Sequence, residues 1–516
     1  MKKNDRTYNS ISNSVYGILS YLIILIITFI SRKVFVSSLG NVYLGLNSVF
    51  SGFVTMLSLP ELGLSTAMLF FLYKPVAEND ANKVTAYLKF YKKIYNSIGL
   101  IITLIGILFS FTLPFFIHSP LDNKSIQVYF IFYLIGTTIT YFYAYKKNIL
   151  YADQKNRVIS ISHTLFKTSF EIIQMISIFI FKNYIFYLIL MILFNFLENF
   201  YCNYYVNKKY KNLINKKNAE LNISQKKELF KKVKDLLVQN ISGFIVSFTD
   251  NLLISMLLNT FVVAIYSNYL LITATLKTLF SQIFSAFTTS FGNLFVTESI
   301  EKSYDIYLKA QFLAFWLIGF TSITFFVLIQ DFITIWLGER FLFNISLVFI
   351  MTTVYYINCI NVPSISVQNA LGLHYKDKNI MIIQAIVNLV VSYILGIKFG
   401  ISGIMCGTII AMIFPVISKP YIIYKSVFQK SFLLYIKQFS YWGVITLIIG
   451  SITWGICSWF SLSDHLFLSF IIKSLICCLL PNVLYILLNF KNDYFLYYFN
   501  ILKGIISKIL GRNAVK

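Results

Sequence analysis

The chain has 516 residues, of which 57% are hydrophobic and only 12% are charged, and its formal net charge is +24. Soluble domains carry about 25% charged residues, so this composition excludes a soluble globular protein and indicates one embedded in a bilayer. The basic residues stand beside apolar segments, which is typical of cytoplasmic loops near an anionic leaflet and does not indicate a nucleic-acid partner.

Apolar segments of roughly 20 residues, the length that crosses a bilayer, recur along the whole chain. The first lacks a small-x-small cleavage site, so we expect it to be retained as a helix. The predicted spans are 12–31, 43–72, 94–117, 125–145, 158–181, 184–206, 236–258, 262–290, 310–329, 343–365, 379–397, 400–418, 440–461 and 465–490. The sequence therefore predicts an all-α polytopic membrane protein with about fourteen transmembrane helices.

The distribution of lysine and arginine predicts the orientation of these helices. With the N-terminus inside, 35 of the 44 basic residues fall in the inside segments and 6 in the outside segments. Because basic residues favour the cytoplasmic side, both termini are predicted to be cytoplasmic.

One long inside loop divides the predicted spans. Residues 207–235 contain ten lysines and separate the first six helices from the next six. We therefore predict an N-terminal lobe over 1–215, a linker and C-terminal lobe over 216–437, and two extra helices with a basic tail over 438–516. The basic segments 224–234, 419–437 and 491–516 are either amphipathic helices on the cytoplasmic leaflet or solvated loops.

Signatures of enzymes are absent from the sequence. There is no GxxxxGK[ST] phosphate loop, no GxSxG elbow and no HExxH helix, and the six cysteines form no CxxC pair. We therefore predict no catalytic residue, no cofactor and no metal site, and expect a transporter driven by gradients or by the potential of its substrate. The predicted outer loops are too short for the external domain expected of a membrane glycan polymerase or ligase.

Ionisable residues at membrane depth are candidates for function, because each is costly unless it faces a cavity or a partner. The candidates are Arg32, Lys33, Glu61 (which follows Pro60), Lys167, Glu171, Asp250, Lys277 and Lys473. Lys167 and Glu171 are spaced i, i+4 and are predicted to form an intramembrane ion pair. Lys473 lies near a span end, from which its ammonium can snorkel to the interface.

The remaining candidates each allow two interpretations. Arg32 and Lys33 form an adjacent cationic pair, which either anchors the first helix at the interface or binds an anion. Asp250 and Lys277 lie on neighbouring spans and either pair or line a cavity. Pro60 removes a helix hydrogen bond directly before Glu61, which favours a role in conformational switching or ion coupling.

Several segments resemble the polysaccharide flippases, the O-unit and capsule-unit exporters of the multidrug/oligosaccharidyl-lipid/polysaccharide exporter superfamily. The similar segments are RKVFVSSLGNVYLGLN over 32–47, LSLPELGLSTA over 57–67, LYKPVAEND over 72–80, and Asp250 with AIYSNY over 264–269. The resemblance implies two six-helix lobes around a central cavity, with the two C-terminal helices appended.

The resemblance also implies a function. Such a flippase would move undecaprenyl-pyrophosphate-linked oligosaccharides from the inner to the outer leaflet of the bacterial cytoplasmic membrane by alternating access, for O-antigen (lipopolysaccharide) or capsule synthesis. The polysaccharide polymerase machinery and membrane lipids are the implied partners. The cationic cavity residues of the family map onto Arg32 and Lys33, and more loosely onto Lys277, whereas Pro60, Glu61 and Asp250 take the coupling role.

Two alternatives remain open. A multidrug or cation antiporter of the same superfamily would need buried acids, and this chain offers acids as well as bases. A membrane glycan polymerase or ligase is disfavoured by the short outer loops. The lipid II flippase of peptidoglycan synthesis has a richer set of arginines in its first two helices than this chain, in which Arg32 is the only arginine of that region past Arg6. The sequence does not identify the sugar.

Overall fold

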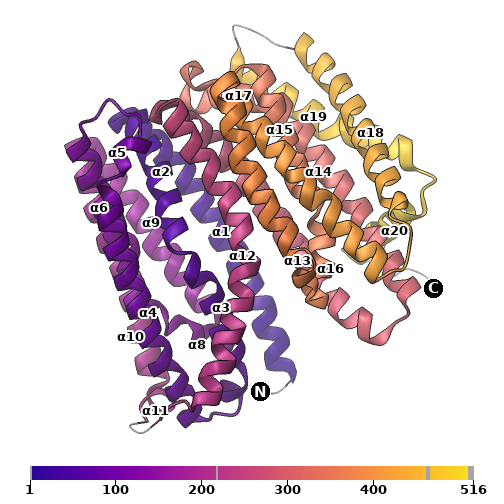
Figure 1. Ribbon diagram of the computed structural model, residues 1–516. Helices are drawn as coiled ribbons and strands as arrows, with labels where there is room; N and C mark the ends of the chain where they lie inside the picture. The colour runs from indigo at the N-terminus through magenta and orange to yellow at the C-terminus, as the bar shows by residue number, and fades with distance from the viewer. Residues whose placement is uncertain (1–2, 217–218, 461–464, 510–516) are drawn as a thin grey trace. The chain divides into compact units, whose positions relative to one another are not determined.

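The computed structural model describes residues 3–216, 219–460 and 465–509, and this part of the chain is helical throughout, without a strand (Figure 1). Eleven helices in it are long and apolar enough to cross a membrane. The structure confirms an all-α polytopic membrane protein, whereas the number of fourteen spans stays a prediction.

The chain divides into two compact units, Met1–Ser267 and Asn268–Lys516. Unit 1 contains α1 (Lys3–Leu39), α2 (Asn41–Leu57), α3 (Leu59–Ala77), α4 (Ala81–Ser110), α5 (Leu113–Phe116), α6 (Asn123–Thr138), α7 (Tyr141–Ala144), α8 (Lys147–Ala152), α9 (Asn156–Phe181), α10 (Tyr184–Lys209), α11 (Lys211–Ile214) and α12 (Ile223–Leu257). Helix α13 (Thr260–Thr297) begins in unit 1 and continues into unit 2.

Unit 2 contains the remaining helices. They are α14 (Ile300–Leu337), η1 (Glu339–Phe341), α15 (Ile345–Ile360), α16 (Val362–Leu371), η2 (Leu373–Lys376), α17 (Lys378–Ser426), α18 (Leu433–Trp459), α19 (Leu466–Asn489) and α20 (Asp493–Ile509). The division within α13 places α12 among the helices of unit 1, where it packs against α2 and α3. The predicted lobe boundaries stay a prediction.

Three places account for the difference between eleven and fourteen spans. The predicted span 43–72 is two helices, because the chain breaks at Ser58 between α2 and α3. The predicted span 236–258 lies in α12, whose side chains over 234–248 are outside the described residues. The predicted spans 379–397 and 400–418 are both contained in α17.

The break at Ser58 changes the place of the proline. Helix α3 begins at Leu59, so Pro60 falls in its first turn, where the missing N–H of a proline needs no partner. The Ser58 hydroxyl donates instead to the carbonyl of Val54, at 2.7 Å. Pro60 thus starts a helix, and does not interrupt one as the prediction of a single span implied.

Helix α17 reverses direction at Gly400, whose φ of 59° and ψ of −140° are not helical. Asn388 donates to the Thr408 hydroxyl at 3.1 Å, although residues so far apart in one helix would be about 30 Å apart. A Cβ on Gly403 would lie 2.0 Å from the Leu395 carbonyl oxygen. The two halves are therefore an antiparallel hairpin packed backbone to backbone.

In unit 1, drawn from indigo to magenta in Figure 1, α1 packs along α9, and α10 packs against both α9 and α6. A short bridge joins the loop after α5 to the α12–α13 turn, because His118 donates to Ser255 and Thr260 donates to His118 through their backbones. A Cβ on Gly45 would meet the Thr260 carbonyl oxygen at 1.9 Å. The start of α2 thus lies directly on the start of α13.

In unit 2, α14 packs against α15, α18 and α19. Its aromatic side chains form much of the core: Phe315 stacks on Trp442 at 5.8 Å, and Trp316 donates to Asn482 at 2.9 Å. The predicted appended helices, α18 and α19, are thus part of one core with α14.

Candidate functional site

Arg32 lies near the C-terminal end of α1, half-buried within unit 1. Its guanidinium donates to the Ser267 carbonyl oxygen at 2.8 Å and lies 3.5 Å from the Ser267 hydroxyl. Glu171 on α9 and Tyr187 on α10 are close enough to interact with it electrostatically. The cation predicted at the end of the first helix is therefore held among polar groups of three other helices.

Glu171 is the acidic member of this cluster and is only 4% exposed. Lys167 lies 2.6 Å from one of its carboxylate oxygens, and Gln174 donates to the other. Two turns of α9 thus bring a base, an acid and an amide together. With Arg32, the cluster contains two cations and one anion at membrane depth, where unbalanced charge is costly.

Tyrosines surround the other side of the cluster. Tyr184, at the start of α10, is 2% exposed and donates to Asn47 at 2.6 Å. Its ring lies 4.8 Å from that of Tyr43, 5.0 Å from that of Tyr129 and 5.6 Å from that of Tyr187. Of these tyrosines, Tyr187 lies near both Arg32 and Glu171, and it links the packed rings to the charged cluster.

The other predicted site residues lie in different surroundings. Lys33 is exposed. The side chains of Pro60 and Glu61 are outside the described residues, so their roles stay predictions. Asp250 on α12 is 5% exposed and accepts a hydrogen bond from Tyr266 at 3.4 Å, within unit 1.

Lys277 belongs to unit 2. It is exposed on α13 and donates to the Asn358 side chain at 2.8 Å. Its predicted role in binding an anion stays a prediction.

Lys473 has an ionic partner that the sequence did not indicate, and the snorkelling of its ammonium to the interface stays a prediction. Its side chain is 10% exposed and lies 2.8 Å from the Asp331 carboxylate, which joins α19 to α14. Sequence reasoning missed this partner, because α14 continues eight residues beyond the predicted span end at residue 329.

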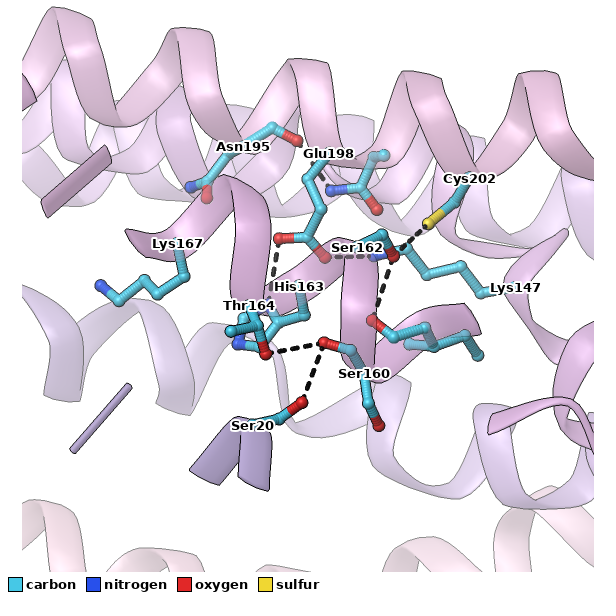
Figure 2. A network of polar contacts seen from close by, with 12 residues as sticks. Ser20, Lys147, Ser160, Ser162, His163, Thr164, Lys167, Asn195, Glu198 and Cys202 are labelled. Carbon is cyan, nitrogen blue, oxygen red and sulfur yellow. Dashed lines mark hydrogen bonds and ion pairs between the residues drawn. The ribbon is translucent and has the colours of Figure 1, made fainter. Parts of the chain in front are cut away.

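Sequence reasoning also missed an acid–base cluster between α8, α9 and α10, shown in Figure 2. Glu198 lies 2.9 Å from the Lys147 ammonium through one carboxylate oxygen and 3.1 Å from Nδ1 of His163 through the other. Cys202, one turn further along α10, contacts the Ser162 hydroxyl at 3.4 Å. The predicted spans leave Lys147 in a loop, and His163 has no second histidine or cysteine near it in the sequence to draw attention to it.

A further ion pair lies at the loop that follows α8. Asp153 contacts Lys155 and accepts a hydrogen bond from the Tyr210 hydroxyl at 2.5 Å. Burial, together with this hydrogen bond to a carboxylate, raises the pKa of Tyr210. The pair thus ties the end of α10 to the α8–α9 loop.

No family model matches the chain, and no curated protein matches it. Solved structures do match. A lipid II flippase, MurJ, in an inward closed conformation, has 15% identity and a TM-score of 0.67, and the match covers 93% of this chain and 99% of that one. An inward-facing multidrug resistance transporter of the MATE family has 15% identity and a TM-score of 0.62, with 79% and 96% covered.

A transporter from Pyrococcus furiosus, described as having a binding pocket of reverse polarity, matches with 13% identity and a TM-score of 0.55, covering 80% of this chain and 93% of that one. These neighbours are two membrane transporters and a lipid II flippase. At such identities the likeness shows the fold alone. The chain has the fold that these three proteins share.

Proposed function

We propose that the protein is a flippase that moves undecaprenyl-pyrophosphate-linked oligosaccharides from the inner to the outer leaflet of a bacterial cytoplasmic membrane by alternating access. The observation that carries this proposal is the extent of the structural match. The lipid II flippase structure covers 93% of the chain, whereas the multidrug transporter structures cover 79–80%. This larger shared extent supports a lipid-linked substrate over a small cation.

The charged residues of unit 1 support the same proposal. A pyrophosphate carries about two negative charges, which hydrocarbon excludes. The fork of an arginine binds phosphate oxygens in pairs, and Arg32 is accompanied by Lys167 beside Glu171. With Lys33 as a further predicted cation of this unit, a pyrophosphate would exchange its hydration for basic groups while its polyprenyl tail stays in lipid.

The electrical potential of the membrane adds a driving force. With the inside negative, moving an anionic charge outward gains about 2.3 kcal/mol per charge per 100 mV. The protein then needs to lower the free-energy barrier to translocation and to open its binding site alternately to each side of the membrane. Polysaccharide polymerase machinery would use the oligosaccharide on the outer side.

A multidrug or cation antiporter is the second candidate, and the buried acids favour it. Glu171 and Asp250 are 4% and 5% exposed, and an exporter of organic cations needs acids at membrane depth. In cells that lack the protein, the flippase predicts accumulation of a lipid-linked oligosaccharide, whereas the antiporter predicts increased sensitivity to cationic drugs.

The first test is the analysis of lipid-linked oligosaccharides by mass spectrometry in cells that lack the protein. We expect a polyprenyl-pyrophosphate oligosaccharide to accumulate and the surface glycan to disappear, and the mass would identify the sugar. An unchanged lipid-linked pool, with increased sensitivity to cationic drugs, would overturn the flippase proposal in favour of the antiporter.

Charge reversal then tests the site. Arg32→Glu should abolish restoration of the surface glycan, whereas Arg32→Lys should keep part of it because a cation remains. Arg340→Glu is the matched control, since Arg340 is an exposed arginine in η1. Equal restoration by Arg32→Glu and Arg340→Glu, at equal amounts of protein in the membrane, would remove Arg32 from the site.

A further inference from the structure

The cluster of Glu198, His163 and Lys147 lies within unit 1, apart from the residues proposed to bind the substrate. Its members come from α10, α9 and α8, and the Glu198 and Lys147 side chains are 13% and 18% exposed. His163 is 51% exposed. The cluster thus combines a largely buried ion pair with a histidine whose side chain is about half exposed.

The hydrogen bonds fix where a proton can bind. The ammonium of Lys147, 2.9 Å away, keeps Glu198 ionised, and an ionised carboxylate only accepts hydrogen bonds. Nδ1 of His163, 3.1 Å from the second carboxylate oxygen, must therefore carry a hydrogen and donate it. This leaves Nε2 of the neutral ring without a proton, so Nε2 is the free basic atom of the cluster.

The other groups near the cluster are compatible with an ionised Glu198 and a hydrogen on Nδ1 of His163. Lys167, further along α9, is bound to Glu171, and in Figure 2 its side chain points away from Glu198. Helices α1 and α6 contribute neutral contacts, through Ser20 to the Ser160 carbonyl and through the Gly136 carbonyl to Asn195. Other titratable neighbours are Tyr151 of α8, Cys202 of α10 and Tyr143 of α7.

The position of the cluster suits exchange with one side of the membrane. His163 lies about two turns from the start of α9, and Glu198 about three turns from the end of α10. The distribution of basic residues predicts that both helix ends are cytoplasmic. A proton would therefore reach His163 from the cytoplasm.

We propose that Glu198, His163 and Lys147 form a reversible proton-binding site, in which Nε2 of His163 takes up the proton, and that this site couples transport to the proton gradient. A hydronium ion gives its proton to Nε2 and leaves as water, so the cluster changes from neutral to a charge of +1. Histidine is the side chain that changes charge in this way between pH 5 and 8. The coupling to transport rests on the proposed function, whereas proton binding does not.

Nuclear magnetic resonance of the full chain in lipid tests proton binding directly. The chain has only four histidines, at 118, 163, 374 and 465, so ¹⁵N-histidine labelling gives a simple spectrum, and His163→Gln assigns the signal. We expect Nε2 of His163 to gain a hydrogen between pH 8 and 5, and its protonated fraction at pH 6 to fall at least threefold in Glu198→Gln. His118, which is exposed outside the spans, serves as the internal control.

A second pair of variants separates proton binding from packing. Lys147→Met frees the carboxylate to hold the imidazolium, so the protonated fraction of His163 at pH 7 should rise. Lys147→Arg keeps the cation and should restore the wild-type titration. The proposal would be overturned by a His163 signal that does not change between pH 8 and 5, or by a His163 titration that is the same in Glu198→Gln, in Lys147→Met and in the wild type.

Proteoliposomes test the coupling. With an undecaprenyl-pyrophosphate-linked disaccharide as the probe and a pH-sensitive dye inside, wild type should move protons together with the probe, and His163→Gln should lose at least nine-tenths of that proton movement. Proton movement unchanged in His163→Gln would overturn the coupling. If the wild type moves no probe at all, the proposed function fails, and the magnetic resonance titration still decides whether the site binds a proton.

Discussion

Two charged clusters of unit 1 differ from one ion pair of unit 2 in the number of partners that each carboxylate has. In unit 1 each of two buried carboxylates has more than one polar partner: Glu171 has Lys167 and Gln174 with Arg32 nearby, and Glu198 has Lys147 and His163. In unit 2, Lys473 and Asp331 form one ion pair between α19 and α14. A carboxylate with several partners can exchange one for another during transport, whereas a buried pair of this kind holds two helices together. We therefore propose a transport role for these charges of unit 1 and a role in stability for that pair.

The largest expected effect on stability comes from a substitution in the hairpin of α17, where the backbones of the two halves are packed against each other. Gly403→Ala would place a methyl group 2.0 Å from the backbone oxygen of Leu395, and backbone cannot move aside as a side chain can. We expect a loss of about 3 kcal/mol or more in the free energy of unfolding. Thermal unfolding in detergent, followed by size-exclusion chromatography, measures it.

Gly443→Ala in α18 is the control for that variant. A Cβ at Gly443 meets nothing within 4 Å, so alanine should stabilise the helix by about 0.5–1 kcal/mol. Equal unfolding temperatures for Gly403→Ala and the wild type would show that the two halves of the hairpin can separate at little cost.

Removing one member of the unit 2 ion pair should give the next largest effect. Lys473→Met leaves the Asp331 carboxylate largely buried without its cation, and we expect a loss of about 3 kcal/mol. The double variant Lys473→Met/Asp331→Leu removes both charges and should recover most of it. Unfolding midpoints of the three proteins in detergent decide this. A double variant as unstable as the single one would show that the pair is not what holds α19 to α14.

The same substitution in unit 1 should have the smallest effect on stability. Lys167 is 35% exposed, and its partner Glu171 keeps the hydrogen bond from Gln174. Lys167→Met should therefore cost about 0.5 kcal/mol or less, while lowering the restoration of surface glycan. Unfolding and restoration are measured on the same preparations. If Lys167→Met destabilises the protein as strongly as Lys473→Met, the contrast between the two units is wrong.

What the sequence could predict depended on how far apart the partners lie along the chain. Lys167 and Glu171 share one helix, so their spacing alone placed them together, and the ion contact is there at 2.6 Å. Lys473 and Asp331 are 142 residues apart, and Glu198 is 51 residues from Lys147. Contacts between helices are set by packing, which a single sequence does not display, so both clusters were missed.

The places where helices end were also not visible in the pattern of apolar residues. A long apolar run over 43–72 predicts one span, but local geometry ends α2 at Leu57 and starts α3 at Leu59, with Pro60 in the first turn. Glycines recur at 396, 400, 403 and 407, and Gly403 and Gly407 lie against Leu395 and Ser392. The sequence did not show that the chain reverses at a single residue.

The reversal at Gly400 has a consequence for how the protein is made. Ser392 and Asn388, in the first half of α17, are fully buried, and their hydrogen-bond partners Ile404 and Thr408 lie in the second half. While only the first half has left the ribosome, these polar groups have no such partners, and lipid supplies none. With almost no loop to translocate between the halves, the hairpin should enter the bilayer as one unit.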